Sequence, residues 1–309
     1  MSSHRRLGIL ASSDSSYAQA ICVAAKNANM DAEVLSFAEL ATSLDSRTPV
    51  CSQVHVKDRR LDEFDAVLVR TMPLGSLEQV IFRMDALQAA VDAGVLVVNS
   101  PKCLETCIDK WLTLHRLHQA GLPVPRTVAC QTREQAMDAF QSMESDVVIK
   151  PIFGGEGRGM MRIADQDLAW RVFSTLQQNR SVVYLQQFHE SVGYDVRILL
   201  VGDRAYSMRR QTAAGGWRTN VALGGVCEAY EPEQAEFDLA RRARDSVARD
   251  SSEFSVVGVD LLPCHDGTIQ VLEVNAVPGW KGLQSVTQVD MSAEVIRHVA
   301  DACRSQSRG

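Results

Sequence analysis

Short apolar blocks alternate with helical stretches through the first hundred residues, and this alternation constrains the fold more than any other feature of the sequence. In chain order these segments are Leu7–Ala11, Tyr17–Ala28, Ala32–Phe37, Ala66–Arg70, Leu77–Asp92 and Val95–Val98. Strands that alternate with helices are typical of a parallel sheet flanked by helices. We therefore expect an N-terminal α/β domain over residues 1–100.

The rest of the chain predicts two further domains. Ser100 can cap a helix that has Pro101 in its first turn and extends to about Ala120. Strand, helix and glycine-loop signals follow up to Gln187, and hairpin and helix signals continue from there to the C-terminus. A chain of 309 residues accommodates two or three domains. We expect an α/β (α+β) fold with domains over residues 1–100, 101–187 and 188–309.

The composition narrows the class of protein. With 46% hydrophobic residues and a formal net charge of −6, the chain is typical of a globular protein, and neither disorder nor a nucleic-acid partner is expected. Apolar blocks such as Val95–Val98 are far shorter than the roughly 20 residues that span a membrane, and Leu7–Ala11 is too short for a secretory signal. We expect a cytoplasmic protein with no membrane partner, and interpret its scattered cysteines as reduced thiols.

A glycine-rich segment follows a buried-looking strand that ends in Lys150. Gly154, Gly155, Gly157 and Gly159 fall within six positions, which suits a loop whose backbone amides close over phosphates while the lysine supplies charge. The segment lacks the terminal Gly-Lys-Ser/Thr of a Walker A loop and the spacing of the dinucleotide fingerprint. For the glycines alone, a flexible hairpin loop with a surface lysine is an equally good interpretation.

A C-terminal hairpin supplies the second candidate site. Counting outward from a two-residue turn at Asp266–Gly267 places Asp260 opposite Glu273, with Asn275 on the same face. Facing carboxylates repel each other unless a hard divalent cation lies between them. Pro263 fits poorly in a strict two-residue hairpin; a four-residue loop would keep this register and an odd-length loop would lose it. The alternative is a solvated acidic hairpin.

These ordered motifs resemble the ATP-grasp superfamily, specifically its glutamate ligases of the ribosomal S6 modification type, along essentially the whole chain. Besides the glycine loop and the hairpin, the motifs that match are Asp109-Lys110, the hinge strand Tyr184–Phe188, Asp195-Val196-Arg197 and Arg218-Thr219-Asn220. The resemblance implies an ATP-grasp fold preceded by the parallel-sheet domain, with ATP and Mg²⁺ (or Mn²⁺) as cofactors. The hinge departs from the family pattern, because Gln186-Gln187 replaces the usual Gln-Glu.

The resemblance also implies roles for individual residues. Nucleotide contacts are expected from Lys110, Lys150, Gly154, Gly155, Gly157, Gly159, Gln186, Gln187, Phe188, Asp195, Arg209 and Arg218. Metal ligands are expected at Asp260, Glu273 and Asn275, and the catalytic residues would be Arg218 and Lys150. Adjacent Arg209 and Arg210 project to opposite faces of their strand, so that at most one of them points into the site. Taken singly, each arginine is more often a surface residue.

The implied activity is an ATP-dependent carboxylate–amine ligation through an acyl phosphate, with Arg218 stabilising the charge that develops. Residues 75–85, together with Arg70, are similar to ligases that add L-glutamate to tetrahydromethanopterin, so a small cofactor-type carboxylate acceptor is expected. A protein or peptide C-terminus as acceptor, a phosphotransferase and an ATP-binding regulatory module without ligase activity remain alternatives. The sequence leaves the oligomeric state open, a homo-oligomer included.

Overall fold

The computed structural model describes residues 5–45, 53–155, 157–212, 216–219 and 225–306. The first sheet is parallel, with the strand order β2-β1-β6-β7. Its strands are β1 (Arg5–Leu10), β2 (Met30–Leu35), β6 (Ala66–Val69) and β7 (Leu96–Val98), and the helices α1 (Ser16–Asn27) and α2 (Leu77–Asp92) connect them. Every residue of β6 is buried, as in a central parallel strand covered on both faces. The parallel sheet expected from the sequence is confirmed.

A small antiparallel sheet beside the first was not expected. It consists of β3 (Leu40–Ser43), β4 (Gln53–Val56) and β5 (Arg59–Arg60). Only Val54 and Val56 of this sheet are buried, and β3 and β5 are largely exposed. Such short strands carry too few apolar residues to give a recognisable alternation.

The single helix predicted after Ser100 is two helices in the structure, α3 (Pro101–Ile108) and α4 (Lys110–Gln119). Asp109 separates them in an extended conformation, and its side chain accepts a hydrogen bond from the N–H of Leu112 at 3.0 Å. Asp109 is therefore the N-cap of α4. This break places Lys110 in the first turn of a new helix.

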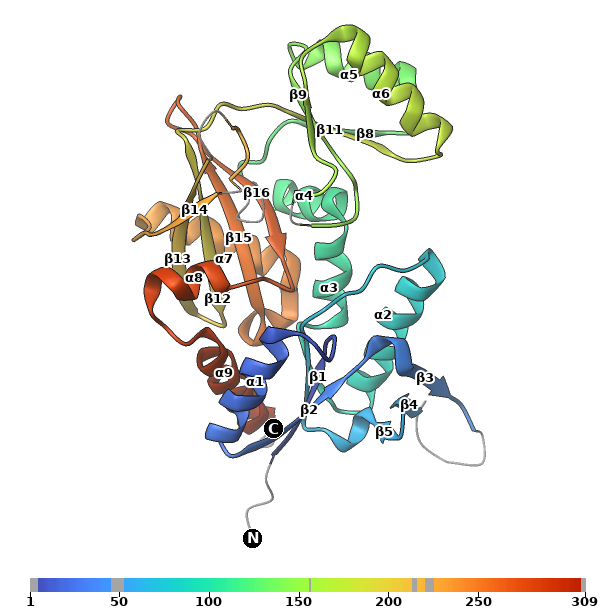
Figure 1. Ribbon diagram of the computed structural model, residues 1–309, viewed down its shortest axis with the longest axis vertical. Coiled ribbons are helices and arrows are strands. Elements are labelled where there is room, and N and C mark those ends of the chain that lie inside the picture. The colour runs from blue at the N-terminus through green and yellow to red at the C-terminus, as the bar shows by residue number, and fades with distance from the viewer. Residues whose placement is uncertain (1–4, 46–52, 156, 213–215, 220–224, 307–309) are drawn as a thin grey trace.

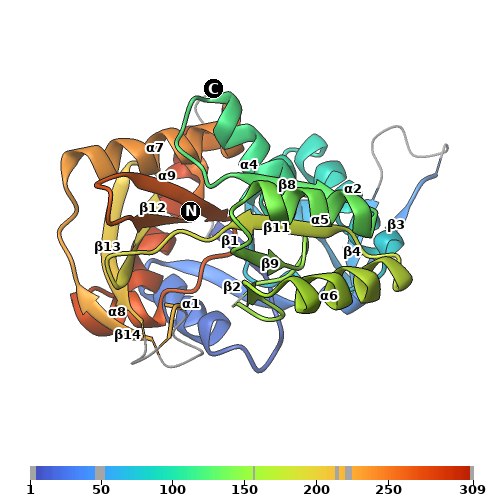
Figure 2. The same ribbon diagram turned by 90° about the horizontal axis from the view of Figure 1, so that it is seen from above.

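The second large sheet has the order β10-β9-β11-β8 and lies at the opposite end of the molecule from the parallel sheet (Figure 1). Its strands are β8 (Thr127–Cys130), β9 (Val147–Lys150), β10 (Met161–Ile163) and β11 (Val183–Gln187). Helices α5 (Arg133–Ser142) and α6 (Gln166–Gln178) cover one face, with Phe140 and Phe173 buried between them and the sheet (Figure 2). Val147 and Ile149 point to this core, so Val148 and Lys150 point to the other face.

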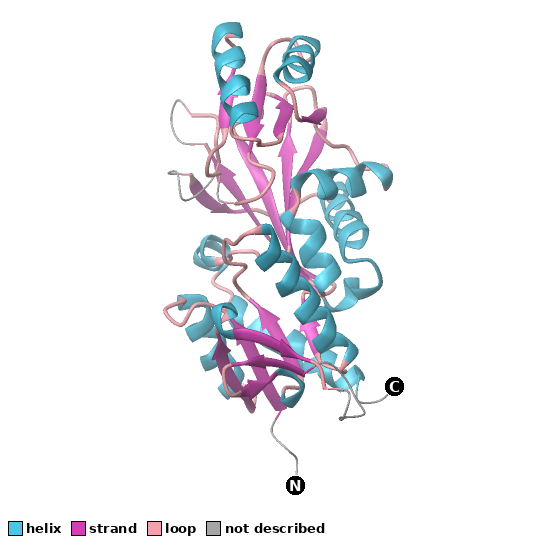
Figure 3. Ribbon diagram, turned by 90° about the vertical axis from the view of Figure 1, so that its right-hand side faces the viewer, coloured by secondary structure: helices cyan, strands magenta, loops and turns pink. Residues whose placement is uncertain are grey.

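The third large sheet is antiparallel, with the order β14-β13-β12-β15-β16. Its strands are β12 (Tyr194–Val201), β13 (Arg204–Gln211), β14 (Val226–Ala229), β15 (Val256–Pro263) and β16 (Ile269–Asn275). The C-terminal part also holds helices α7 (Gln234–Ala248), α8 (Lys281–Thr287) and α9 (Met291–Gln306). Helix α7 packs against this sheet, and α9 returns to α1, so the first strand and the last helix lie at the same end of the molecule (Figure 3).

The β15–β16 hairpin reaches the predicted pairing by a different route. Its loop has three residues, because the N–H of Cys264 bonds to the carbonyl of Thr268, and Pro263 pairs with Ile269. The predicted turn register near the loop is therefore wrong by one residue. A bulge at Leu272 restores the count, so that Asp260 does lie opposite Glu273.

The structure also bears on two further expectations, one about membrane-spanning helices and one about the cysteines. In the described part of the chain, no helix combines the length and the apolar character that crossing a membrane requires. The cysteines that the structure describes are all free thiols, as interpreted from their spacing.

Candidate functional site

A cavity of about 360 Å³ lies between the open face of the β8–β11 sheet and the β12–β16 sheet. Most of the residues singled out from the sequence line it, namely Lys110, Lys150, Gly154, Gly155, Gly157, Gln186, Gln187, Phe188, Asp195, Arg218, Asp260 and Glu273. Asn275 lines a smaller cavity that adjoins it through shared residues. Gly159 and Arg209 line neither. The fold thus gathers residues that are up to about 160 positions apart in the sequence.

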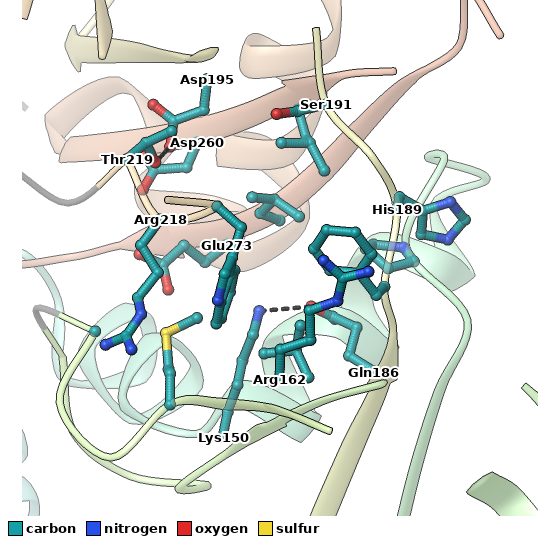
Figure 4. Close-up of a pocket in the computed structure, with 18 of the residues that line it drawn as sticks. Lys150, Arg162, Gln186, His189, Ser191, Asp195, Arg218, Thr219, Asp260 and Glu273 are labelled. Carbon is teal, nitrogen blue, oxygen red and sulfur yellow. Dashed lines mark hydrogen bonds between the residues drawn. The ribbon is translucent and has the colours of Figure 1, made fainter. Parts of the chain in front are cut away.

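Two lysines approach the cavity from different elements. Lys150 ends β9 and donates a hydrogen bond from Nζ to Oε1 of Gln186 at 2.5 Å, the dashed line in Figure 4. Lys110 donates from Nζ to the carbonyl of Gly154 at 2.6 Å. Burial lowers the pKa of Lys150 to about 8 and also lowers that of Lys110, while the charge of Glu273 opposes both shifts. Both ammonium groups therefore lack full solvation and would gain from an anion.

The glycine loop adopts backbone conformations that residues with a side chain rarely take. Gly154 and Gly157 have φ angles of 108° and 72°. Gly159 also has a positive φ, of 72°. A side chain is excluded there for a second reason, because a Cβ would lie 2.8 Å from the Pro151 ring. Gly159 therefore shapes the loop instead of lining the cavity. Residue 156 lies outside the described residues.

Two backbone N–H groups of the hinge after β11 already donate hydrogen bonds within the protein. The N–H of Gln187 donates to the carbonyl of Arg126 at 2.9 Å, and that of Phe188 donates to the carbonyl of Asp146 at 3.0 Å. Gln186 is buried and donates from Nε2 to Thr127. A ligand at the hinge would therefore meet its carbonyls and side chains in place of these two N–H groups.

The two facing carboxylates lie on the β15–β16 hairpin, and Asn275 shares their face. Nδ2 of Asn275 donates to Oε1 of Glu273 at 3.0 Å, which leaves the amide oxygen of Asn275 as an acceptor. Among the described residues, no three His, Cys, Asp or Glu side chains gather into a group that could hold a metal. The candidate cation site therefore consists of two carboxylates and one amide.

Buried ion pairs hold Asp260. Arg197 makes a two-point contact with it, Nε to Oδ1 at 2.7 Å and Nη2 to Oδ2 at 2.6 Å, and Arg210 adds a contact to Oδ2 at 2.9 Å. Burial would raise the pKa of the Asp260 carboxyl, but the charges and hydrogen bonds of Arg197 and Arg210 outweigh it and hold that pKa well below its usual range. Asp260 is therefore ionised, and one further lone pair on Oδ1 remains for a cation.

Arg210, and not the expected Arg209, is the member of that pair that faces the cavity. Arg210 binds Asp195 through two contacts of 2.7 and 2.6 Å, whereas Arg209 bonds to Glu228 on the neighbouring strand. The signal was available in the sequence, because a Gly202–Asp203 turn places Arg210 opposite Asp195. The charge of Asp195 is therefore matched within the protein.

The loop before β14 brings Arg218 to the cavity. The Arg218 guanidinium lies 5.2 Å from the Trp217 ring, and the hydroxyl of Thr219 donates to Asp195. In the view of Figure 4, Arg218 approaches from the side of Asp195 and Asp260, opposite Gln186. Asn220, the last residue of the predicted Arg-x-Asn motif, lies outside the described residues.

Comparison with known proteins assigns the chain to a family. The family described as the RimK-like ATP-grasp domain matches residues 107–299. The chain belongs to the RimK-like ATP-grasp family. It is an ATP-grasp ligase, as the resemblance in its motifs implied, and ligases of this family use ATP and magnesium.

Relatives of this ATP-grasp chain differ in their acceptors. Tetrahydromethanopterin:alpha-L-glutamate ligase of Methanosarcina acetivorans is 28% identical over 306 residues, covering 91% of this chain and 94% of that protein. Ribosomal protein bS6–L-glutamate ligase of Escherichia coli is 27% identical over 254 residues, covering 81% of each chain.

Solved structures share the fold of the RimK-like chain. A RimK domain ATP-grasp protein of Sphaerobacter thermophilus has a TM-score of 0.71 at 23% identity, covering 96% of this chain and 99% of that one. The ATP-grasp ligase PsnB, complexed with a minimal precursor, has a TM-score of 0.73 at 22% identity, covering 98% and 99%. The ATP-grasp fold predicted from the sequence is confirmed.

Proposed function

We propose that this ligase adds L-glutamate to a small cofactor-type acceptor of the tetrahydromethanopterin kind, using ATP to activate a carboxylate. The observation that carries the proposal is that Lys110, Lys150 and the glycine loop line the same cavity as Asp260 and Glu273. The acceptor follows from the names of several relatives, which join L-glutamate to that cofactor.

In this proposal each of the three domains has its own role at the cavity. The domain over residues 101–187 would hold the nucleotide, with Lys110, Lys150 and the glycine loop on its phosphates and the hinge on its base. The domain over residues 188–309 would supply the cation site and Arg218. The parallel-sheet domain over residues 1–100 would contribute to acceptor binding, where Arg70 lies at the carboxyl end of β6.

The donor set fits Mg²⁺, with Mn²⁺ as a substitute. Carboxylate and amide oxygens are the ligands that such hard cations prefer, and Asp260 offers one lone pair on Oδ1 in addition to the side chains of Glu273 and Asn275. When bound, the cation would neutralise charge on the phosphates.

The reaction has two steps, and in both of them the side chains of the enzyme stabilise charge. A carboxylate oxygen attacks the γ-phosphorus of ATP, the bond to the β-γ bridging oxygen breaks, and ADP leaves. The amine attacks the acyl carbon of the resulting acyl phosphate, its nitrogen gives a proton to water or to a phosphate oxygen, and inorganic phosphate leaves with the C–O bonding electrons. Lys150 would stabilise the charge on the transferring phosphoryl group, and Arg218 would stabilise the tetrahedral oxyanion.

A protein or peptide C-terminus is the second candidate acceptor. Neighbours with the same fold were solved with peptide ligands, including a ligase of Chryseobacterium gregarium in complex with ADP and a leader and core peptide, at a TM-score of 0.73 and 14% identity. The E. coli relative is named for a ribosomal protein as acceptor.

The test measures ADP release with magnesium and L-glutamate in the presence of a pterin cofactor, of a peptide ending in glutamate, or of no acceptor. Mass spectrometry of the pterin product should show a gain of one or more glutamyl units. A gain on the peptide alone would move the assignment to the second acceptor. If the protein binds ATP but no acceptor stimulates the release of ADP, ligase activity on these acceptors is contradicted.

A further inference from the structure

Arg162 on β10 contacts both a carboxylate and an aromatic ring of the hinge. Its guanidinium makes a two-point contact with Asp146, Nε to Oδ1 at 2.9 Å and Nη2 to Oδ2 at 2.6 Å. The same guanidinium lies 3.5 Å from the centroid of the Phe188 ring. Arg162 and Phe188 both line the cavity. The guanidinium is thus paired with a carboxylate and lies over an aromatic ring.

The lining of the cavity includes both cationic and apolar side chains. The lysines and Arg218 supply positive charge near the glycine loop, whereas Val148, Leu262 and Leu272 are apolar lining residues. Figure 4 shows Arg162 on the side of Gln186 and His189, away from Arg218. Arg162 therefore stands at the hinge end, where the base of a nucleotide would lie if its phosphates occupy the glycine loop.

The contacts of Arg162 suit a base better than a phosphate. Asp146 already balances its charge, so little net attraction for an anion remains. A planar guanidinium can stack on an aromatic base, and the contact with Asp146 does not use Nη1, which can still donate a hydrogen bond. The N–H groups of Gln187 and Phe188 already donate to protein carbonyls, so a hydrogen bond to an acceptor on the base would have to come from a side chain such as Arg162.

We propose that Arg162 is a nucleobase-contacting residue that stacks on a purine and favours purine over pyrimidine nucleotides. The proposal rests on the proposed nucleotide site. Asp146 and Phe188 act as positioning residues that hold the guanidinium plane. The larger face of a purine would gain more from this stacking than a pyrimidine does.

The test compares Arg162→Leu and Arg162→Lys with the unaltered enzyme. Arg162→Lys keeps a charge for Asp146 but removes the planar group, which separates stacking from loss of the ion pair. Arg133→Leu is the matched control, because Arg133 lies 4.9 Å from the Trp170 ring on the same β8–β11 unit but does not line the cavity. Calorimetry would give the Kd of ADP, CDP and inorganic tripolyphosphate with magnesium, and thermal melting would verify folding.

Both Arg162 variants should weaken ADP binding about tenfold, with a smaller loss for CDP and none for tripolyphosphate. The preference for ADP over CDP should therefore narrow, a change that a merely structural role would not produce. Equal losses for ADP and tripolyphosphate would overturn the proposal in favour of a phosphate contact, as would unchanged ADP binding in both variants. If the unaltered enzyme binds neither ADP nor tripolyphosphate, the proposed nucleotide site itself fails.

Discussion

The side-chain amide of Asn99 donates a hydrogen bond to the main-chain carbonyl of Ala276, the residue directly after the candidate metal ligand Asn275. Asn99 follows β7 in the parallel sheet and is only 2% exposed. It also exchanges two hydrogen bonds with the backbone of Val256, each 2.7 Å long, where β15 begins. One side chain thus joins the N-terminal sheet to both strands that carry the candidate cation site.

Asn99→Ala should therefore damage stability and the cation site together. The Val256 N–H and the Ala276 carbonyl would lose buried partners, at about 1–3 kcal/mol for each group. We expect a lower free energy of unfolding in urea and a higher magnesium concentration for half-maximal ADP release. Asn179→Ala, at the exposed C-cap of α6, is the control and should change neither. An unaltered magnesium dependence in a destabilised Asn99 variant would show that the link is structural only.

The neighbouring arginines of β13 should respond very differently to the same substitution. Arg210→Met leaves the buried carboxylate of Asp195 without a cationic partner and that of Asp260 with Arg197 alone, and removing one member of a buried pair costs about 3–5 kcal/mol. Arg209→Met removes a partly exposed pair with Glu228, and we expect a much smaller loss. Urea unfolding of the two variants measures the contrast. Equal losses would contradict the assignment of Arg210 to the buried network.

Regular pairing rules carry more information about the site than the expected residue set used. The alternation of side chains and a two-residue turn at Gly202–Asp203 are enough to place Arg210 beside Asp195, but the resemblance to the family suggested Arg209, and that expectation was wrong. Hydrophobic periodicity likewise predicted the parallel sheet and the extent of helix α2. These features depend on residues close in sequence, which is why a single sequence reveals them.

Features that depend on distant contacts could not be predicted in the same way. The bulge at Leu272 compensates a three-residue loop, and no local signal distinguishes this from the expected register. Asp109 fits the middle of one long helix as well as the N-cap of a second one, and the structure uses it as the cap. The Asn99 bonds join residues 157 and 177 positions apart, so only the folded chain shows them.

Glu273→Gln should raise the magnesium requirement of the enzyme. The substitution keeps the shape and a hydrogen-bond acceptor for Asn275 but removes one of the two carboxylate charges offered to the cation. We expect half-maximal ADP release to need at least tenfold more magnesium. Glu228→Gln, on β14 beside Arg209 and outside both cavities, is the matched control and should leave the requirement unchanged. A normal magnesium titration for Glu273→Gln would remove this residue from the ligand set.

The lowered pKa of Lys150 predicts how nucleotide binding depends on pH. Burial brings that pKa to about 8 in the free enzyme, so Lys150 is charged below pH 8 and loses its proton as the pH rises above it. Phosphates bind the charged form, and the Kd of ATP should therefore rise from pH 8 to pH 9.5, approaching tenfold per pH unit. Calorimetric titrations with ATP across this range measure the slope.

Lys150→Arg is the control for this prediction, because a guanidinium stays charged across the whole range. The variant should bind ATP with a shallower pH dependence, whatever its affinity at pH 7. Lys110 also has a lowered pKa from burial, so some slope should persist in the arginine variant. If the two proteins show the same slope above pH 8, the titrating group is not Lys150, and its ammonium does not contact the phosphates.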